Sequence, residues 1–233
     1  MVERCILIPA RLDSSRLPGK VLLPIKEIPM VVQVAINCMS SKSAEVIVLT
    51  PDDEVAETCA KYGIKFSYSS SSCQNGTERI IEFSQNNSYK SYISVQADEP
   101  SLSPDMIKDF VHKSMHENCI GVAKISHNFD LDSDSIVKIV KSKSGKLLYA
   151  SRSAIPFDPN SESSTFKHVG IYSYNKEGLR LLDSISVGKL EHSEKIEILR
   201  FLENDIEVKC VELDYLGYSI DTIQDYKKIT SES

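Results

Sequence analysis

The chain has 233 residues, of which 41% are hydrophobic and 26% are charged, and these values are typical of a globular protein that can bury a full core. Its formal net charge of -6 at pH 7 argues against a general nucleic-acid-binding surface. The sequence contains no apolar stretch long enough to span a membrane, no recognisable signal peptide and no CxxC pair among its six cysteines. We therefore expect one cytoplasmic domain over residues 1–233, with reduced thiols and with neither nucleic acid nor membrane as a partner.

Strands and helices alternate at short intervals through the first half of the sequence. Apolar runs predict strands over residues 4–8, 45–50 and 92–96, and near Phe66. Helical spacing and capping residues predict helices over 30–40, from Asp52 to Gly63, from Thr77 to Phe83, and from Ser103 to about Glu117. This alternation predicts a three-layer α/β fold with a mostly parallel sheet. Ligands of such sheets bind beyond the carboxyl ends of the strands.

The second half has a different pattern. It predicts strands over 135–142, 146–151 and 168–174, helices near 176–185 and 191–204, a strand over 206–213, and a last helix after Asp221. The pattern from about residue 135 to 190 therefore indicates an insertion that either extends the sheet or forms a dimer arm.

A basic loop follows the first predicted strand. Residues 8–20 read IPARLDSSRLPGK, so Arg11, Arg16 and Lys20 share one loop, and we expect Lys20 to have no acidic neighbour that occupies it. Three cations and exposed backbone amides suit a triphosphate, because arginine offers a planar fork of donors and lysine a point charge. The loop has neither the Walker A pattern nor the GxGxxG spacing. The plain alternative is a basic surface loop.

Acidic residues follow two other predicted strands. The segment YISVQADEP places Asp98 and Glu99 after a buried strand, and Asp221 follows the later segment GYSI. Carboxylates from two strand ends would form an open Mg²⁺ site, with water and phosphate oxygens completing the coordination. The alternative is that Asp98 caps a turn and Asp221 caps the last helix.

These motifs resemble those of the CMP-sugar synthetases, especially 3-deoxy-manno-octulosonate (Kdo) cytidylyltransferase, over residues 4–229. The family patterns QGDEP, VDTPEDL and QSGTER correspond to QADEP, IDTIQDY and QNGTER in this chain, and the basic loop matches as well. The resemblance implies a Rossmann-like nucleotidyltransferase fold, a homodimer and Mg²⁺ held by Asp98 and Asp221. It also implies that CTP is bound by Pro9, Ala10, Arg11, Arg16, Lys20, Gln74, Gly76 and Arg79, with Gln74 and Arg79 reading the cytosine.

The resemblance continues in the second half, where SRSAIP and HVGIY match SRATIP and HLGIY. It implies a pocket for a 2-keto-3-deoxy sugar acid. Arg152 suits the carboxylate of such a sugar, and the side chains that suit or face the rest of it are Gln96, His168, Tyr172 and Glu197. Two positions depart from the family. Ala97 replaces a glycine, and Ile198 replaces a glutamine, so we expect a Kdo-like sugar that is altered at one hydroxyl. The alternative is that Ile198 packs in a helix interface and another side chain makes the lost contact.

The predicted reaction joins CMP from CTP to the anomeric hydroxyl of the sugar and releases pyrophosphate. Lys20, Asp98 and Asp221 are the predicted catalytic residues, and alignment and electrostatics make a covalent enzyme nucleophile unnecessary. The alternatives are a sugar nucleotidyltransferase of the spore-coat polysaccharide or CMP-nonulosonate type and a non-catalytic nucleotide-binding protein. His112 and His116 have metal-like spacing, but a solvated helix face is the simpler interpretation.

Overall fold

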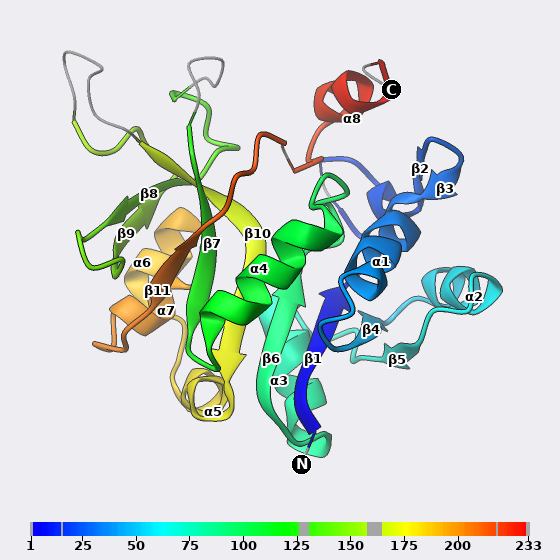
Figure 1. The fold of residues 1–233 in the computed structure, drawn as a ribbon, viewed down its shortest axis with the longest axis horizontal. Coiled ribbons are helices and arrows are strands. Elements are labelled where there is room, and N and C mark those ends of the chain that lie inside the picture. Colours follow the sequence, from blue (N-terminus) through cyan, green and yellow to red (C-terminus); the bar gives the residue numbers. More distant parts are fainter. Residues whose placement is uncertain (1, 15, 126–130, 158–164, 218, 232–233) are drawn as a thin grey trace.

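The computed structural model describes residues 2–14, 16–125, 131–157, 165–217 and 219–231. Figure 1 shows one central sheet with helices on both faces. The strand order is β11-β7-β10-β6-β1-β4-β5, and β8 pairs with both β10 and β9. The strands of this sheet are β1 Val2–Pro9, β4 Glu45–Thr50, β5 Phe66–Tyr68, β6 Tyr89–Val95, β7 Cys119–Lys124, β8 Lys138–Lys141, β9 Leu147–Ser151, β10 Phe166–Asn175 and β11 Lys209–Glu212.

The sheet is mostly parallel around the two strands that carry the predicted motifs. Strand β1 runs parallel to β4 and β6, and β4 runs parallel to β5. Strand β10 runs antiparallel to β6 and β7, while β11 is parallel to β7. The predicted α/β fold class is therefore confirmed. The part over about 135–190 extends the sheet, because β8 and β9 continue it beside the start of β10.

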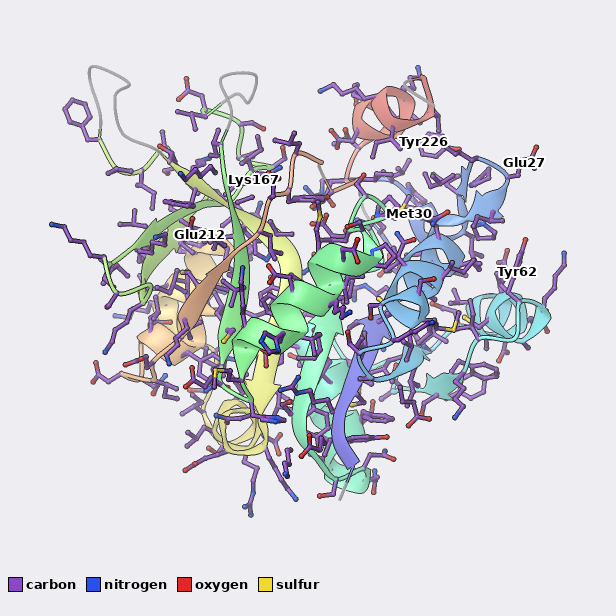
Figure 2. The ribbon with its side chains drawn as sticks, in the orientation of Figure 1. Glu27, Met30, Tyr62, Lys167, Glu212 and Tyr226 are labelled. Carbon is purple, nitrogen blue, oxygen red and sulfur yellow. The ribbon has the colours of Figure 1, made fainter. Side chains whose placement is uncertain are left out.

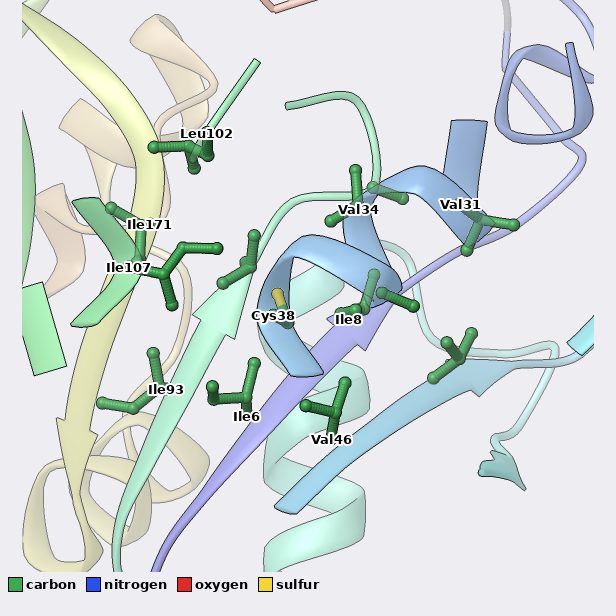
Figure 3. Close-up of a cluster of buried hydrophobic side chains, with 14 of the residues drawn as sticks. Ile6, Ile8, Val31, Val34, Cys38, Val46, Ile93, Leu102, Ile107 and Ile171 are labelled. Carbon is green, nitrogen blue, oxygen red and sulfur yellow. The ribbon is translucent and has the colours of Figure 1, made fainter. Parts of the chain in front are cut away.

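Alternating side chains of β1 supply both halves of the core. Ile6 and Ile8 pack on one face with α1 and α4, and Figure 3 shows them beside Cys38. Cys5 and Leu7 pack on the other face with α3, α5 and α7. Successive strand residues point to opposite faces, so an unbroken apolar strand is buried on both sides. The helices are α1 Met30–Ser40, α2 Asp53–Lys61, α3 Gly76–Asn86, α4 Pro104–Ser114, α5 Lys176–Ser184, α6 Lys189–Glu194, α7 Leu199–Leu202 and α8 Ile223–Ser231.

Several predicted boundaries need correction. Strand β7 is absent from the sequence prediction, and the expected helix over 191–204 is broken at Lys195, which adopts a left-handed conformation with φ 56°. Helix α3 is capped by Asn75, whose side chain accepts a hydrogen bond from the backbone of Glu78, whereas the sequence pattern favours Thr77 as the cap. The error in α3 lies at a helix end, where local side-chain bonding decides the outcome. The break at Lys195 lies inside the predicted helix and divides it into α6 and α7.

A short turn and a small hairpin follow the basic loop. A 3₁₀ turn at Lys20–Leu22 leads into a small hairpin of β2 (Pro24–Ile25) and β3 (Ile28–Pro29). All six cysteines are free thiols. In the described part of the chain, every helix is too short or too polar to cross a bilayer.

Candidate active site

A pocket of about 640 Å³ opens beyond the carboxyl ends of β1 and β6 and beside the first half of β10. This is the edge of the sheet at which ligands of α/β proteins bind. Every predicted site residue except Gln74 lines it. The lining residues from that prediction are Pro9, Ala10, Arg11, Arg16, Lys20, Gly76, Arg79, Gln96, Asp98, Arg152, His168, Tyr172, Glu197 and Asp221.

Lys20 connects the two predicted metal ligands. Its Nζ lies 2.5 Å from Oδ2 of Asp98 and 2.9 Å from Oδ1 of Asp221, and Nη2 of Arg16 lies 2.9 Å from the same Asp221 oxygen. Burial lowers the pKa of Lys20, but attraction to the two carboxylates outweighs burial and raises it overall, so the ammonium is charged. The expectation that Lys20 has no acidic neighbour is therefore wrong, because folding brings Asp98 and Asp221 to it.

The residues present fit a small hard cation. Oδ1 of Asp98 is buried and has no hydrogen-bond partner among the described residues, which is the state of an oxygen that lacks its ligand. Asp98 and Asp221 meet the same ammonium, and the described residues contain no group of three or more His, Cys, Asp and Glu side chains that could hold a metal. Mg²⁺ commonly takes one or two carboxylates and completes its shell with water and phosphate oxygens.

Glu99 joins the segments that carry these two aspartates. It is fully buried, and its carboxylate accepts hydrogen bonds from Tyr215 Oη (2.5 Å), Ser219 Oγ (2.6 Å) and the backbone nitrogen of Gly170 (2.9 Å). A Cβ atom on Gly170 would lie 2.7 Å from this carboxylate, which explains the glycine in HVGIY. Burial, with the charge of Asp98, raises the pKa of Glu99. Glu99 therefore fixes the strand ends rather than facing the substrate.

The basic loop and the start of α3 form the nucleotide side. Nη1 of Arg11 donates to the backbone oxygen of Gln74 (2.8 Å), which ties the loop to α3. A Cβ on Gly76 would lie 3.2 Å from Cβ of Pro9, so a glycine permits this close approach. Arg79 is buried and donates to oxygens of the loop before α3, namely those of Ser69, Ser70 and Cys73.

The structure places Gln74 and Arg79 differently with respect to the pocket. The side chain of Gln74 donates to the backbone oxygen of Ser72 (2.8 Å) and lies outside the pocket. Arg79 lines the pocket, but its bonds hold the 69–73 loop in place. Recognition of the cytosine by Gln74 and Arg79 therefore stays a prediction.

The predicted sugar residues line the same pocket, and we call their part of it the sugar side. Nε2 of Gln96 lies 3.4 Å from Oη of Tyr172, and the rings of Tyr172 and His168 are 5.0 Å apart. Nε2 of His168 is buried without a hydrogen-bond partner among the described residues. Burial, together with the charges of Arg152 and Lys167, lowers the pKa of His168 to about 3, so the ring is neutral. A buried neutral imidazole without a partner suits a sugar hydroxyl.

Ile198 is not a pocket residue. It is 2% exposed and packs in the core cluster of α3, α5 and α7, whereas its neighbours Ile196 and Glu197 line the pocket. The expectation that Ile198 alters sugar recognition is therefore wrong. The break at Lys195 rotates the segment so that Glu197 faces the pocket and Ile198 does not. Ala97, by contrast, does line the pocket.

Sequence reasoning missed Lys167. It precedes His168 on β10, is labelled in Figure 2, is 4% exposed, and lines the pocket beside the ring of Tyr215. Burial lowers the pKa of Lys167 to about 8, and the charge of Glu99 opposes that effect. The one sequence feature that could have indicated Lys167 as a pocket residue is its position directly before the HVGIY motif. His112 and His116 do not form a metal site, because α4 ends at Ser114 and His116 contacts Arg4 and Ser91 instead.

The fold and the site define a nucleotidyltransferase. A solved CMP:2-keto-3-deoxy-manno-octonic acid synthetase in complex with CTP superposes with a TM-score of 0.91 at 30% identity, covering 99% of this chain and 98% of that one. A UDP-glucose pyrophosphorylase structure in complex with UDP-glucose shares only the fold, with a TM-score of 0.71 at 14% identity and coverage of 100% and 98%.

The sequence comparisons give the family. The model described as "Cytidylyltransferase" matches residues 5–209. The 3-deoxy-manno-octulosonate cytidylyltransferase of a Nitratiruptor species is 37% identical, covering 97% of this chain and 98% of that protein. The protein of the same name from Thermodesulfovibrio yellowstonii is 36% identical, with coverage of 97% and 95%. The chain belongs to the cytidylyltransferase family and is a nucleotidyltransferase enzyme.

Proposed function

We propose that this enzyme transfers CMP from CTP to the anomeric hydroxyl of Kdo, or of a closely similar 2-keto-3-deoxy sugar acid, and releases pyrophosphate. The observation that carries the proposal is that one pocket holds both sets of residues. Lys20, Asp98 and Asp221 meet there, and Arg152, His168 and Tyr172 line the same pocket. The relatives named as 3-deoxy-manno-octulosonate cytidylyltransferases support this choice of sugar.

The residues on the nucleotide side would bind the charged triphosphate and the metal ion. Arg11, Arg16 and Lys20 would bind the triphosphate, and charge-assisted bonds of this kind are stronger than neutral ones. Asp98 and Asp221 would hold Mg²⁺, which supplies charge neutralisation at the phosphates when bound. Because Lys20 contacts both carboxylates, it would exchange these contacts for a phosphate oxygen when CTP and Mg²⁺ bind.

The sugar side would act by orientation. Arg152 would bind the carboxylate, while the neutral His168, Tyr172 and Gln96 would bind hydroxyl groups. Fixing the sugar and the α-phosphate in one pocket lowers the entropic part of the barrier. A polar pocket also rejects analogues that leave its own buried groups unpaired.

The cellular setting follows as part of the proposal. We place the enzyme in the cytoplasm, because six free cysteines are characteristic of a reducing compartment. The activated sugar would serve lipopolysaccharide or other surface polysaccharide synthesis. We also propose a homodimer formed through residues 135–190, in which Leu148 and Phe157 are 55% and 92% exposed. Light scattering coupled to gel filtration tests the dimer.

A pyrophosphate-release assay tests the activity. The enzyme is incubated with magnesium, each of the four ribonucleoside triphosphates, and a panel of Kdo, other 2-keto sugar acids and sugar phosphates. We expect release only with CTP and fastest with Kdo, and almost none with Asp98→Asn or Asp221→Asn. Equal release with UTP, or a preference for a sugar phosphate, would overturn the proposed function.

A further inference from the structure

A fully buried lysine lies directly behind the sugar side of the pocket. Lys138 on β8 is 0% exposed, and its Nζ donates hydrogen bonds to the backbone oxygens of Ser133 (2.9 Å), Ile136 (2.8 Å) and Arg152. An ammonium group has three N–H donors and no acceptor, so these three carbonyls match its capacity. Lysine is almost never buried so completely unless its charge is compensated, and here backbone oxygens contribute to that compensation.

The three carbonyls belong to residues that line the pocket. Ser133 and Ile136 lie in the loop before β8, and Arg152 follows β9. Nη1 of Arg152 reaches back to the same loop and donates to the backbone oxygen of Asp134 (2.7 Å). The hydrogen bonds of Lys138 therefore join the 133–136 loop to the main chain of Arg152. The bond from the Arg152 side chain to Asp134 joins the same two segments.

Glu194 holds Arg152 from the other direction. Its carboxylate accepts from the backbone nitrogen of Arg152 (2.8 Å) and from Oγ of Ser151 (2.7 Å), and its backbone oxygen accepts from Nε of Arg152 (2.8 Å). The main chain of Arg152 is thus bound on one side by Lys138 and on the other by Glu194. These contacts orient the arginine through hydrogen bonds, and among the described residues Arg152 forms no ion pair.

The guanidinium group keeps capacity for a ligand. Arginine has five N–H donors. The bonds to the backbone oxygens of Glu194, Asp134 and, at 3.5 Å, Lys195 engage three of them within the described part of the chain. One N–H on Nη1 and one on Nη2 remain for a ligand such as a carboxylate.

We propose that Lys138 is a positioning residue that sets recognition of the substrate's carboxylate through Arg152, although Lys138 itself touches no substrate. The inference rests on the proposed function, in which Arg152 binds that carboxylate. Loss of the Lys138 bonds would free the Arg152 main chain and the 133–136 loop together. A displacement of about 1 Å at such a site costs up to about 100-fold in rate.

A double-mutant cycle tests the proposal. We compare kcat/KM for Kdo and for its uncharged C1 carboxamide in the wild type, Lys138→Met, Arg152→Ala and the double variant. We expect Lys138→Met to lower the acid-to-carboxamide preference about 10- to 100-fold, with the KM for CTP nearly unchanged. We expect the double variant to be no worse than Arg152→Ala alone, because residues that act through one contact are not additive. Additive losses, or an unchanged preference in Lys138→Met, would overturn the proposal.

Two further variants keep the test decisive. Lys141→Met is the matched control, because Lys141 lies on the same strand, pairs with Glu212 and does not line the pocket, so the preference should stay at the wild-type value. If Lys138→Met does not fold, Lys138→Gln takes its place, because it removes the charge and one of the three N–H donors, and an unchanged preference there would equally overturn the proposal. If the wild type does not prefer the acid, or Arg152→Ala keeps that preference, the role of Arg152 in the proposed function fails too. Failure of the Lys138 proposal can therefore be told apart from failure of the role of Arg152.

Discussion

Nζ of Lys20 lies 2.5 Å from Oδ2 of Asp98, and this contact joins the phosphate-binding loop to the proposed metal site. Asp221 shares the same ammonium at 2.9 Å, although it lies 201 residues further along the chain. The side chains of Lys20, Asp98 and Asp221 are 13%, 14% and 17% exposed, so water screens these charges only in part. The ligand-free enzyme therefore keeps its two carboxylates together with an internal cation.

Replacing Lys20 with methionine should destabilise the ligand-free enzyme and increase its response to magnesium. Two partly buried carboxylates would then lie close together without a cation, which we expect to cost about 1–3 kcal/mol of unfolding free energy. Added MgCl₂ should restore more of the melting temperature in Lys20→Met than in the wild type. Differential scanning calorimetry without nucleotide measures both effects.

Arg16→Met is the matched control for this prediction. Arg16 also pairs with Asp221, but its side chain is 49% exposed, and exposed ion pairs contribute little. We expect its melting temperature to respond to magnesium as the wild type does. An equal magnesium response in Lys20→Met and the wild type would show that Lys20 does not stand in for the cation.

Ile198→Gln should reduce stability and leave sugar selectivity unchanged. Ile198 packs in the core, so a glutamine there would bury an amide without partners at a cost of about 1–3 kcal/mol. The ratio of kcat/KM for Kdo and its modified analogues should not change, and the conservative Ile198→Val should lose less stability. A changed ratio would mean that this side chain reaches the sugar after all.

His168 should make the enzyme acid-sensitive. Its pKa is lowered to about 3, whereas histidine in an unfolded chain titrates near about 6.5. Between these values the unfolded chain binds one more proton. The stability from the neutral ring is therefore complete above about pH 6.5 and is lost as the pH falls, by about 1.4 kcal/mol per pH unit. Urea unfolding between about pH 7 and pH 4 should be less pH-dependent in His168→Gln by this amount.

The exposed His112 provides the comparison for this pH profile. His112→Gln should follow the wild-type curve, because this exposed side chain lies outside the pocket. Parallel curves for His168→Gln and the wild type would contradict a neutral buried ring at position 168.

Tyr215→Phe should weaken the link between the two strand ends. It removes the donor to Oε2 of Glu99 and leaves a buried carboxylate oxygen without it, at a cost of about 1–3 kcal/mol. Tyr174→Phe, which loses only a 3.5 Å contact to Thr77, should cost less. The apparent activation constant for magnesium should rise in Tyr215→Phe alone. If the two substitutions changed stability and the magnesium activation constant equally, Glu99 would not position Asp98 and Asp221.

The sequence allowed prediction of the strands and helices whose signals are local. The apolar runs at 45–50 and 30–40 match β4 and α1, because burial on one or both faces dictates their periodicity. The motifs at the ends of β1 and β6 also converge as predicted, since parallel strands end at one edge.

Contacts between distant segments could not be predicted. Neither the ion pair of Lys20 with Asp221 nor the bonds from Lys138 to Arg152 has a sequence signature, because each depends on where separate loops meet. The orientation of Ile198 depended on the left-handed Lys195, and lysine rarely adopts that conformation. The pattern 191–204 alone favours a continuous helix that the fold interrupts.

The product formed from CTP and Kdo tests the central claim most directly. Purified enzyme is incubated with both compounds and magnesium, and the mixture is followed by phosphorus NMR and mass spectrometry. The account predicts stoichiometric pyrophosphate and a phosphodiester that joins CMP to the anomeric oxygen of Kdo. Absence of that phosphodiester under conditions in which the enzyme binds CTP, or faster formation of a uridine or phosphosugar product, would contradict it.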